Sequence, residues 1–91
     1  MDRSLSRRFG LLLALHRMRA GLSQEECGKV VGLHRTELSL LERGGRTPRL
    51  DTLLALAAAI ETPPRELVTG MSWSPAVVET SGEYVVDGTD A

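Results

Sequence analysis

The segment from residue 35 to residue 40 carries side chains that can contact the edges of nucleobases in DNA. Arg35 can donate two hydrogen bonds to guanine, and Glu37 can accept one from the amino group of cytosine. Leucine and threonine can place methyl groups against the methyl group of thymine. The alternative is an ordinary solvated helix face, but an exposed leucine among polar neighbours gains little unless something covers it. The candidates for reading bases are Arg35, Thr36, Glu37, Ser39 and Leu40.

Two short helices joined by a tight turn are predicted to hold this segment in place. The first helix opens at Ser23, whose hydroxyl can cap it, while Glu26 three residues later can complete a capping box. Gly32 permits the sharp turn because glycine enters left-handed backbone conformations without the steric penalty of a Cβ atom. The side of this helix expected to face the core carries apolar residues at helical spacing: Cys27, Val30 and Val31.

The second of these helices is predicted from about residue 34 to residue 43, with Gly44 just beyond it. Leu33 fills the space between the two helices, while Leu38 and Leu41 point into the core. The base-reading candidates are then pushed outward. This is the layout of a helix-turn-helix, in which one helix braces the DNA backbone and the next enters the major groove.

Three stretches of the chain resemble the Cro/repressor (XRE) class of helix-turn-helix regulators. They read GLSQEE at 21–26, VGLHRTELSLLERG at 31–44 and TPRLDTLLALA at 47–57, and the similarity extends over roughly residues 9–68. The resemblance implies a lambda-repressor-like DNA-binding domain that binds double-stranded DNA. It says nothing about the operator sequence or the regulated genes.

The whole pattern predicts an all-α fold of five helices over residues 1–70. Besides the two helices of the motif, we expect helices at about 6–20, 50–60 and 64–69, the last opening with a proline in a tolerated position. The residues expected to face the core are Phe9, Leu12, Leu13, His16 and Ala20 in the first helix, and Leu50, Leu53, Leu54, Leu56, Ala57 and Ile60 in the fourth.

The resemblance also assigns roles to residues around the motif. Gln24 matches a glutamine that contacts the DNA backbone, and its place at a helix N-terminus favours a phosphate; the alternative is a solvated polar residue. Arg17 and Glu42 match a partly buried salt bridge that ties the first helix to the third. His34 departs from the usual Ser or Thr, so we expect a weaker cap that frays or approaches a phosphate when protonated.

Three arginines follow the recognition helix and are interpreted as clamps on the DNA backbone. Arginine suits this role because its guanidinium forms bidentate hydrogen bonds with phosphate. The full set of candidates for phosphate contacts is Ser23, Gln24, His34, Arg43, Arg46 and Arg49.

The pattern changes after residue 70, where we place a second region at 71–91. Residues 76–80 and 83–86 favour β-strands, and Ser81 and Gly82 between them suit a hairpin turn. The alternative is a disordered acidic tail. An isolated hairpin is marginal in water, so it would need a surface to lean on. A second apolar stripe on the first helix, formed by Leu11, Leu15 and Met18, is a candidate surface in the same subunit or in a partner.

The charge is divided between these two regions. Residues 1–70 hold all 11 Lys and Arg residues, ten of them Arg, against eight acidic residues, which gives a net charge of +3. Residues 71–91 hold four acidic residues and no basic one. The overall net charge of −1 therefore hides a basic domain, suited to nucleic acid, beside an acidic tail.

Other classes of protein find little support in the sequence. The apolar run at 11–15 is too short to span a membrane, and a single cysteine fits a reducing cytosol, so we expect a cytoplasmic, nucleoid-associated protein. The pattern offers no nucleophile–base set, no phosphate-binding glycine loop and no zinc spacing. We therefore expect no enzyme, catalytic residue, metal, cofactor or small-molecule ligand, with Cys27 and His16 read as core or boundary residues.

Two functions remain open from the sequence. The leading hypothesis is a prokaryotic or phage transcriptional regulator, a repressor or autoregulator, that binds a palindromic operator as a homodimer because one motif reads only a few base pairs. The alternative is an antitoxin-like or anti-regulator subunit. Its main partner would be another protein, engaged through the tail at 71–91 and through the stripe of Leu11, Leu15 and Met18.

Overall fold

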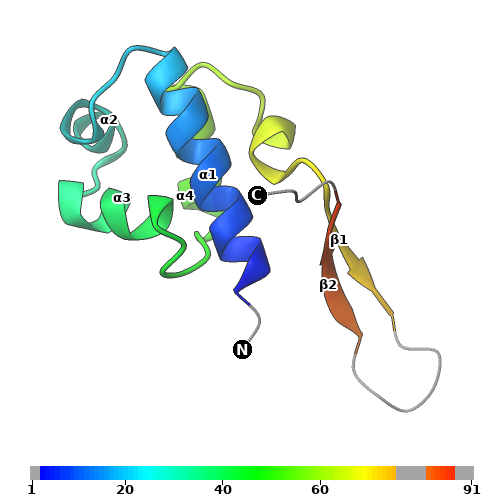
Figure 1. The fold of residues 1–91 in the computed structure, drawn as a ribbon. Coiled ribbons are helices and arrows are strands. Elements are labelled where there is room, and N and C mark those ends of the chain that lie inside the picture. The colour runs from blue at the N-terminus through cyan, green and yellow to red at the C-terminus, as the bar shows by residue number, and fades with distance from the viewer. Residues whose placement is uncertain (1–2, 76–81, 88–91) are drawn as a thin grey trace.

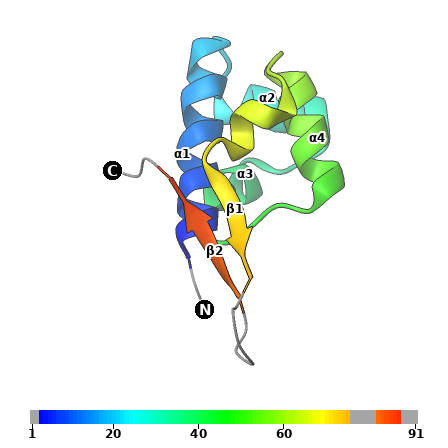
Figure 2. The ribbon, with the colours of Figure 1, turned by 90° about the vertical axis from the view of Figure 1, so that its right-hand side faces the viewer.

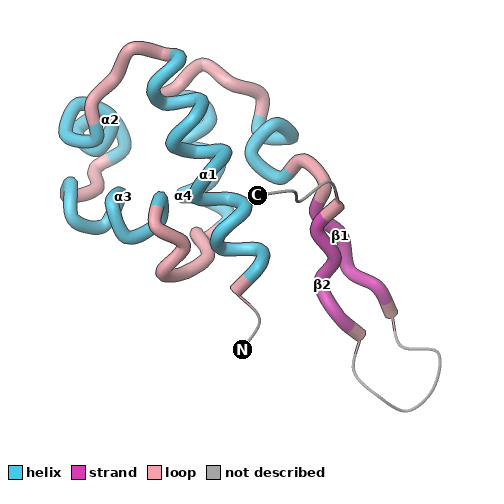
Figure 3. The backbone as a smooth tube through the Cα atoms, viewed as in Figure 1, coloured by secondary structure: helices cyan, strands magenta, loops and turns pink. Residues whose placement is uncertain are grey.

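The computed structural model describes residues 3–75 and 82–87. Four α-helices surround a small apolar core, and a two-stranded sheet extends from one side of them (Figure 1). The tube view shows how short the loops between the helices are (Figure 3). Along the chain the elements are α1 (Ser4–Arg19), α2 (Gln24–Val31), α3 (Arg35–Glu42), α4 (Leu50–Ala59), the 3-10 helix η1 (Pro64–Val68), β1 (Met71–Ser74) and β2 (Glu83–Val86). Within the described residues, no helix is long and apolar enough to cross a membrane.

The expectation of five α-helices is only partly right, because the fifth is a single turn of 3-10 helix. Pro63 and Pro64 have no backbone N–H to donate, and the segment is only five residues long. The N–H of Glu66 donates to the carbonyl of Pro63 at 2.9 Å, the i to i+3 spacing of a 3-10 turn. Leu67 is nevertheless fully buried, so this turn closes the core as the predicted helix would have done.

The turn between α2 and α3 forms as its local signals predict. Ser23 accepts a hydrogen bond from the N–H of Glu26 at 3.0 Å, and its own N–H donates to the Glu26 carboxylate at 2.9 Å. This confirms the capping box. Gly32 ends α2 with a φ of 76°, the left-handed conformation that the turn requires.

The core is assembled from one face of each helix and from η1. Its fully or almost fully buried members are Phe9, Leu13, Cys27, Leu38, Leu41, Leu56, Ala57, Ile60 and Leu67. Leu12, Leu33 and Leu53 are partly buried against this cluster. Most of the apolar positions predicted for the core are therefore confirmed.

Three apolar residues predicted to face the core are exposed instead. Val30 lies at the edge of α2, because Gly28 has no side chain and α3 approaches α2 on the glycine side. Leu50 and Leu54 lie one turn apart on α4, away from the side that packs against α2 and η1. Ala20 was also placed too deep, since it lies exposed in the turn after α1, whereas half-buried His16 is at the boundary of the core.

The sheet confirms one predicted strand and corrects the other. β2 covers residues 83–86 as expected, but its antiparallel partner is β1, with Met71 opposite Val86 and Trp73 opposite Tyr84. The predicted first strand at 76–80 lies outside the described residues. β1 begins directly after Gly70, whose φ of 81° turns the chain and whose carbonyl accepts the N–H of Asp87 at 2.7 Å.

Close packing of α1 on α3 depends on Gly10. A Cβ atom at this position would lie 2.6 Å from the carbonyl oxygen of Leu41 and would also collide with that of Glu42. Both oxygens belong to the backbone, so neither can rotate away. Gly10 therefore sets the distance between α1 and the end of the recognition helix.

We expect Gly10→Ala to lower the free energy of unfolding by about 1–3 kcal/mol, because the added methyl group separates the two helices. Helix propensity alone favours alanine by up to ~1 kcal/mol, so the two effects have opposite signs. Urea unfolding followed by circular dichroism measures the change. A stabilised Gly10→Ala protein would contradict the close approach of α1 and α3.

Candidate nucleic-acid interface

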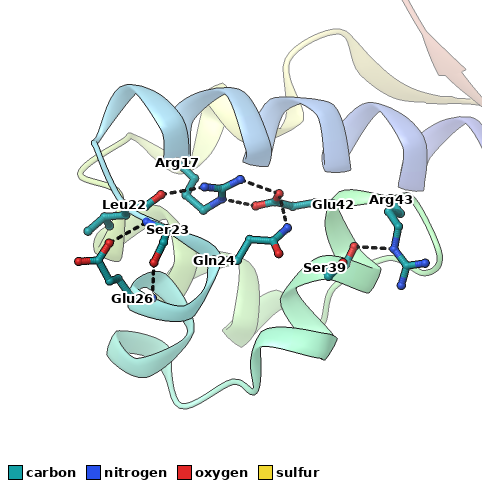
Figure 4. A network of polar contacts seen from close by, with 8 residues as sticks. All are labelled: Arg17, Leu22, Ser23, Gln24, Glu26, Ser39, Glu42 and Arg43. Carbon is teal, nitrogen blue, oxygen red and sulfur yellow. Dashed lines mark hydrogen bonds and ion pairs between the residues drawn. The ribbon is translucent and has the colours of Figure 1, made fainter.

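A buried ion pair between α1 and α3 holds the recognition helix. The Nε of Arg17 donates to Oε2 of Glu42 at 2.6 Å, and Nη2 donates to Oε1 at 3.0 Å (Figure 4). The side chains are only 12% and 7% exposed. The hydrogen bond from the guanidinium to Glu42 is the main cause of a raised pKa for Arg17. Arg17 and Glu42 thus occupy the structural positions that the resemblance implies.

The same ion pair also holds the beginning of α2. Arg17 donates from Nη1 to the carbonyl of Leu22 at 2.7 Å, just before the cap of α2. Gln24 donates from Nε2 to Oε1 of Glu42 at 3.0 Å, as Figure 4 shows. One carboxylate therefore connects three helices. Gln24, predicted to contact phosphate, is partly buried and has its amide oriented by this bond.

The capping box fixes Ser23 and Glu26 at the start of α2. The hydrogen bonds from Ser23 lower the pKa of Glu26, whose carboxylate therefore accepts them over the whole neutral range. Ser23, a predicted phosphate contact, is exposed, although its hydroxyl oxygen already accepts the N–H of Glu26. Its role in the free protein is to cap α2.

The outer face of α3 carries the predicted base-reading residues. Arg35, Thr36 and Glu37 are exposed, while Ser39 is half-buried. Leu40 was expected to be exposed, but it is half-buried because the loop after α3 folds back on it. A Cβ atom at Gly45 would collide with the Leu40 side chain, which shows how closely the two lie.

An ion pair that the sequence analysis missed links α3 to this loop. Nη2 of Arg46, a predicted phosphate clamp, lies 2.9 Å from Oε2 of Glu37, and both side chains are about half exposed. The pair forms because Gly44, with a φ of 76°, turns the chain sharply after α3. Nine residues separate the partners, so helical spacing gave no signal for it.

His34, predicted to be a weaker cap than Ser or Thr, does cap α3 with its ring. Its Nδ1 accepts the N–H of Thr36 at 3.1 Å and lies 2.9 Å from the Thr36 hydroxyl. Imidazole therefore satisfies one of the free N–H groups at the start of the helix, as Ser or Thr would. The exposed ring lies in the wall of a shallow hollow between α2 and α3. The other residues that line this hollow are Glu25, Lys29, Leu33 and Arg35.

The remaining predicted clamps are exposed at the other end of α3 and in the following loop. Arg43 donates from Nε to the carbonyl of Ser39 at 3.3 Å (Figure 4), which leaves its terminal nitrogens outward. Arg49 forms a loose pair with Asp51 at 3.4 Å, and both are largely in solvent. The structure thus brings Arg43, Arg46 and Arg49 to the region where α3 ends.

The two residues considered as redox or metal groups take no part in this site. Cys27 is fully buried in the core, and burial raises the pKa of its thiol, which makes the reactive thiolate rare. His16 is half-buried on α1. Across residues 3–75 and 82–87, no three His, Cys, Asp or Glu side chains gather in a way that could hold a metal ion.

The fold and this site define a class of protein. A capped brace helix, a glycine turn and a second helix with an exposed polar face form a helix-turn-helix of the kind that docks in the major groove of DNA. Residues 8–69 match the helix-turn-helix domain family, which is most of the chain. The chain belongs to this family, and the resemblance to Cro/repressor-type regulators is confirmed.

Three known proteins illustrate the similarity. The control protein C.SmaI of Serratia marcescens is 44% identical over 48 residues, 53% of this chain and 57% of that protein, so the chain spans little more than half of this relative. The structure of the restriction-modification controller protein C.AhdI from Aeromonas hydrophila is 40% identical, with a TM-score of 0.65 over 68% of this chain and 94% of that one. The P22 c2 repressor, solved with a synthetic operator, is 31% identical with a TM-score of 0.63 and the same coverage.

We expect Glu42→Gln to lower the free energy of unfolding by about 3 kcal/mol, because it leaves the buried guanidinium of Arg17 without a counter-charge. The matched control is Lys29→Gln, which breaks an exposed pair with Glu25 and should change stability by less than about 1 kcal/mol. Urea unfolding at neutral pH measures both. Equal effects of the two variants would show that the buried pair does not hold α3.

Proposed function

We propose that this protein is a sequence-specific regulator of transcription that binds double-stranded DNA. The observation that carries the proposal is the exposed face of α3, with Arg35, Thr36 and Glu37 outward on a helix fixed at both ends by His34 and Glu42. Arg35 would donate to guanine, and Glu37 would accept from cytosine. These contacts would provide sequence specificity, with Thr36, Ser39 and Leu40 contributing to the same surface.

Phosphate contacts would position this helix on the duplex. Gln24 and Ser23 lie at the start of α2, where the helix dipole favours an anion, and Gln24 retains a second amide hydrogen beyond the one given to Glu42. His34 would approach the backbone at the start of α3. The DNA backbone would be held beyond the end of α3 by Arg43, Arg46 and Arg49. The net charge of +3 over residues 1–70 would attract the domain to DNA.

The regulator would act as a homodimer on a palindromic operator, in the cytoplasm and at the nucleoid. A single motif reads only a few base pairs, whereas two copies related by a two-fold axis read twice as many. C.SmaI is named a control protein, and C.AhdI is named a restriction-modification controller protein. We therefore infer that this chain represses or autoregulates genes of a restriction-modification system. Residues 1–70 would form the DNA-binding domain and residues 71–91 an accessory region.

Binding to DNA upstream of the protein's own gene tests the proposal. We expect a fluorescence-anisotropy titration to show at least a hundredfold preference for a palindromic site in that DNA over a shuffled duplex of the same composition. Footprinting should show protection of two half-sites about 34 Å apart, one turn of DNA. Salt-dependent binding without preference for any natural promoter would reject sequence-specific regulation.

Base reading and phosphate clamping can be separated by two arginine variants. We expect Arg35→Ala to cost roughly 1–3 kcal/mol of operator binding and to relax specificity at one base pair. Arg43→Ala should weaken binding to all sequences alike and reduce the slope of log K against log salt by about one.

The matched control for these variants is Arg65→Ala, which removes an exposed arginine from η1, on a part of the domain that packs against α1 and α4. We expect it to bind the operator like the original protein. If Arg35→Ala and Arg43→Ala lower affinity for every sequence to the same extent, the division of roles is wrong.

A further inference from the structure

β1 and β2 form an arm that extends beyond the helical part of the molecule (Figure 1, Figure 2). On this arm Trp73 and Tyr84 lie opposite each other, with ring centroids 4.9 Å apart and edge-to-face geometry. They are 51% and 50% exposed. Two large aromatic side chains thus remain half exposed to solvent. They lie on a two-stranded sheet, which is only marginally stable by itself.

The base of the arm is fixed to the domain, whereas the aromatic pair is beyond this attachment. Met71 packs against the core, and β2 lies along α1. Arg8 of α1 donates from Nε to the carbonyl of Thr69 at 3.4 Å, next to the turn at Gly70. The direction of the arm is therefore set by the domain, while Trp73 and Tyr84 are free to contact another surface.

A second apolar surface lies on α1. The stripe of Leu11, Leu15 and Met18 has exposed fractions of 55%, 39% and 60%, so its own arm does not cover it. The stripe lies almost opposite Leu13, which is fully buried in the core. The stripe therefore points away from the core, on the outer side of α1.

The two surfaces have complementary charge and similar length. α1 carries Arg7, Arg8 and Arg19 in addition to Arg17, which is already paired with Glu42, and it has no acidic residue. Residues 71–91 contain four acidic residues and no basic one. From Leu11 to Met18 the stripe measures about 10 Å along the helix. A four-residue strand measures about 13 Å, so one arm can cover one stripe.

From these observations we propose that the arm of one copy packs on the α1 stripe of a second copy, and the reverse. A two-fold dimer makes this contact twice, so the aromatic pair and the α1 stripe of each chain are covered in one step. Acidic Glu83, at the end of β2 away from the attachment to the domain, would face the basic helix. The inference rests on the proposed homodimer and names the surface that forms it.

The test uses the full chain with one change on each side of the contact. Leu15→Glu places an acidic group in the stripe, and Trp73→Ala removes half of the aromatic pair. Sedimentation equilibrium without DNA should show dimerisation weakened about ten- to thirty-fold by either change, as expected for a residue central to an interface. Val30→Glu is the control, since it adds the same charge to an exposed aliphatic site on α2 and should dimerise normally.

A mixture of the two variants identifies the reciprocal arrangement. The mixed dimer keeps one contact with an intact arm and an intact stripe, whereas each variant homodimer has a change in both of its contacts. Leu15 and Trp73 would touch each other in this contact, so their changes are not additive, and the second change in an already weakened contact costs little more. The mixed dimer then loses about one contact and each variant homodimer two, so we expect the mixture to associate more tightly than either variant alone. Both residues are exposed, so we expect both variants to fold. Circular dichroism and thermal melting check that they do.

Three results would overturn the proposal. Normal dimerisation of both variants, together with loss of the dimer on Leu54→Glu, would assign the interface to α4 instead. A mixture no tighter than the separate variants would exclude reciprocal exchange. If the unmodified protein is a monomer and still selects its operator, the arm contact and the homodimer are rejected, but sequence-specific regulation stands. If the protein does not select an operator at all, the proposed regulator is rejected.

Discussion

The orientation of the recognition helix depends on the buried carboxylate of Glu42. It receives two hydrogen bonds from Arg17 on α1 and one from Gln24 on α2, so three helices meet at a single group. Apolar burial is not directional and would tolerate small shifts of α3 against its neighbours. A bidentate pair has a narrow geometry and therefore specifies one arrangement, although burying the charges gives it little net stabilising effect. We interpret this ion pair as a device for positioning α3, with most of the stability supplied by the leucine core.

Close backbone contacts complete this positioning at both ends of α3. Gly10 lets α1 approach the carbonyls of Leu41 and Glu42, and Gly28 leaves 2.5 Å between a hypothetical Cβ atom and the carbonyl of Leu33. Larger residues at either site would move α3 away from its neighbours. The ion pair determines direction and the two glycines determine distance, so the outer face of α3 is fixed without any contact from the DNA side.

Local signals explain which features the sequence could predict. The capping box at Ser23 and the turn at Gly32 depend on residues within one helical turn of each other, and both appear as expected. The exposure of Leu50 depends on which side of α4 other elements leave open, which helical spacing cannot reveal. The partner of β2 also escaped prediction, because residues 76–80 have the stronger β-propensity while β1 is selected by the turn at Gly70 and by packing of Met71 on the core.

The ion pair between Glu37 and Arg46 shows why a candidate site needs tertiary information. A free carboxylate on the recognition helix would be repelled by phosphates, but Arg46 neutralises it from the loop that follows α3. Because both side chains are about half exposed, the pair contributes at most about 1 kcal/mol, and a phosphate can replace Glu37 as the partner of Arg46 at little cost. Glu37 would then be released to accept a hydrogen bond from a base. The same arginine can therefore shield the carboxylate before DNA arrives and clamp the backbone afterwards, which reconciles its contact in the free protein with its predicted role.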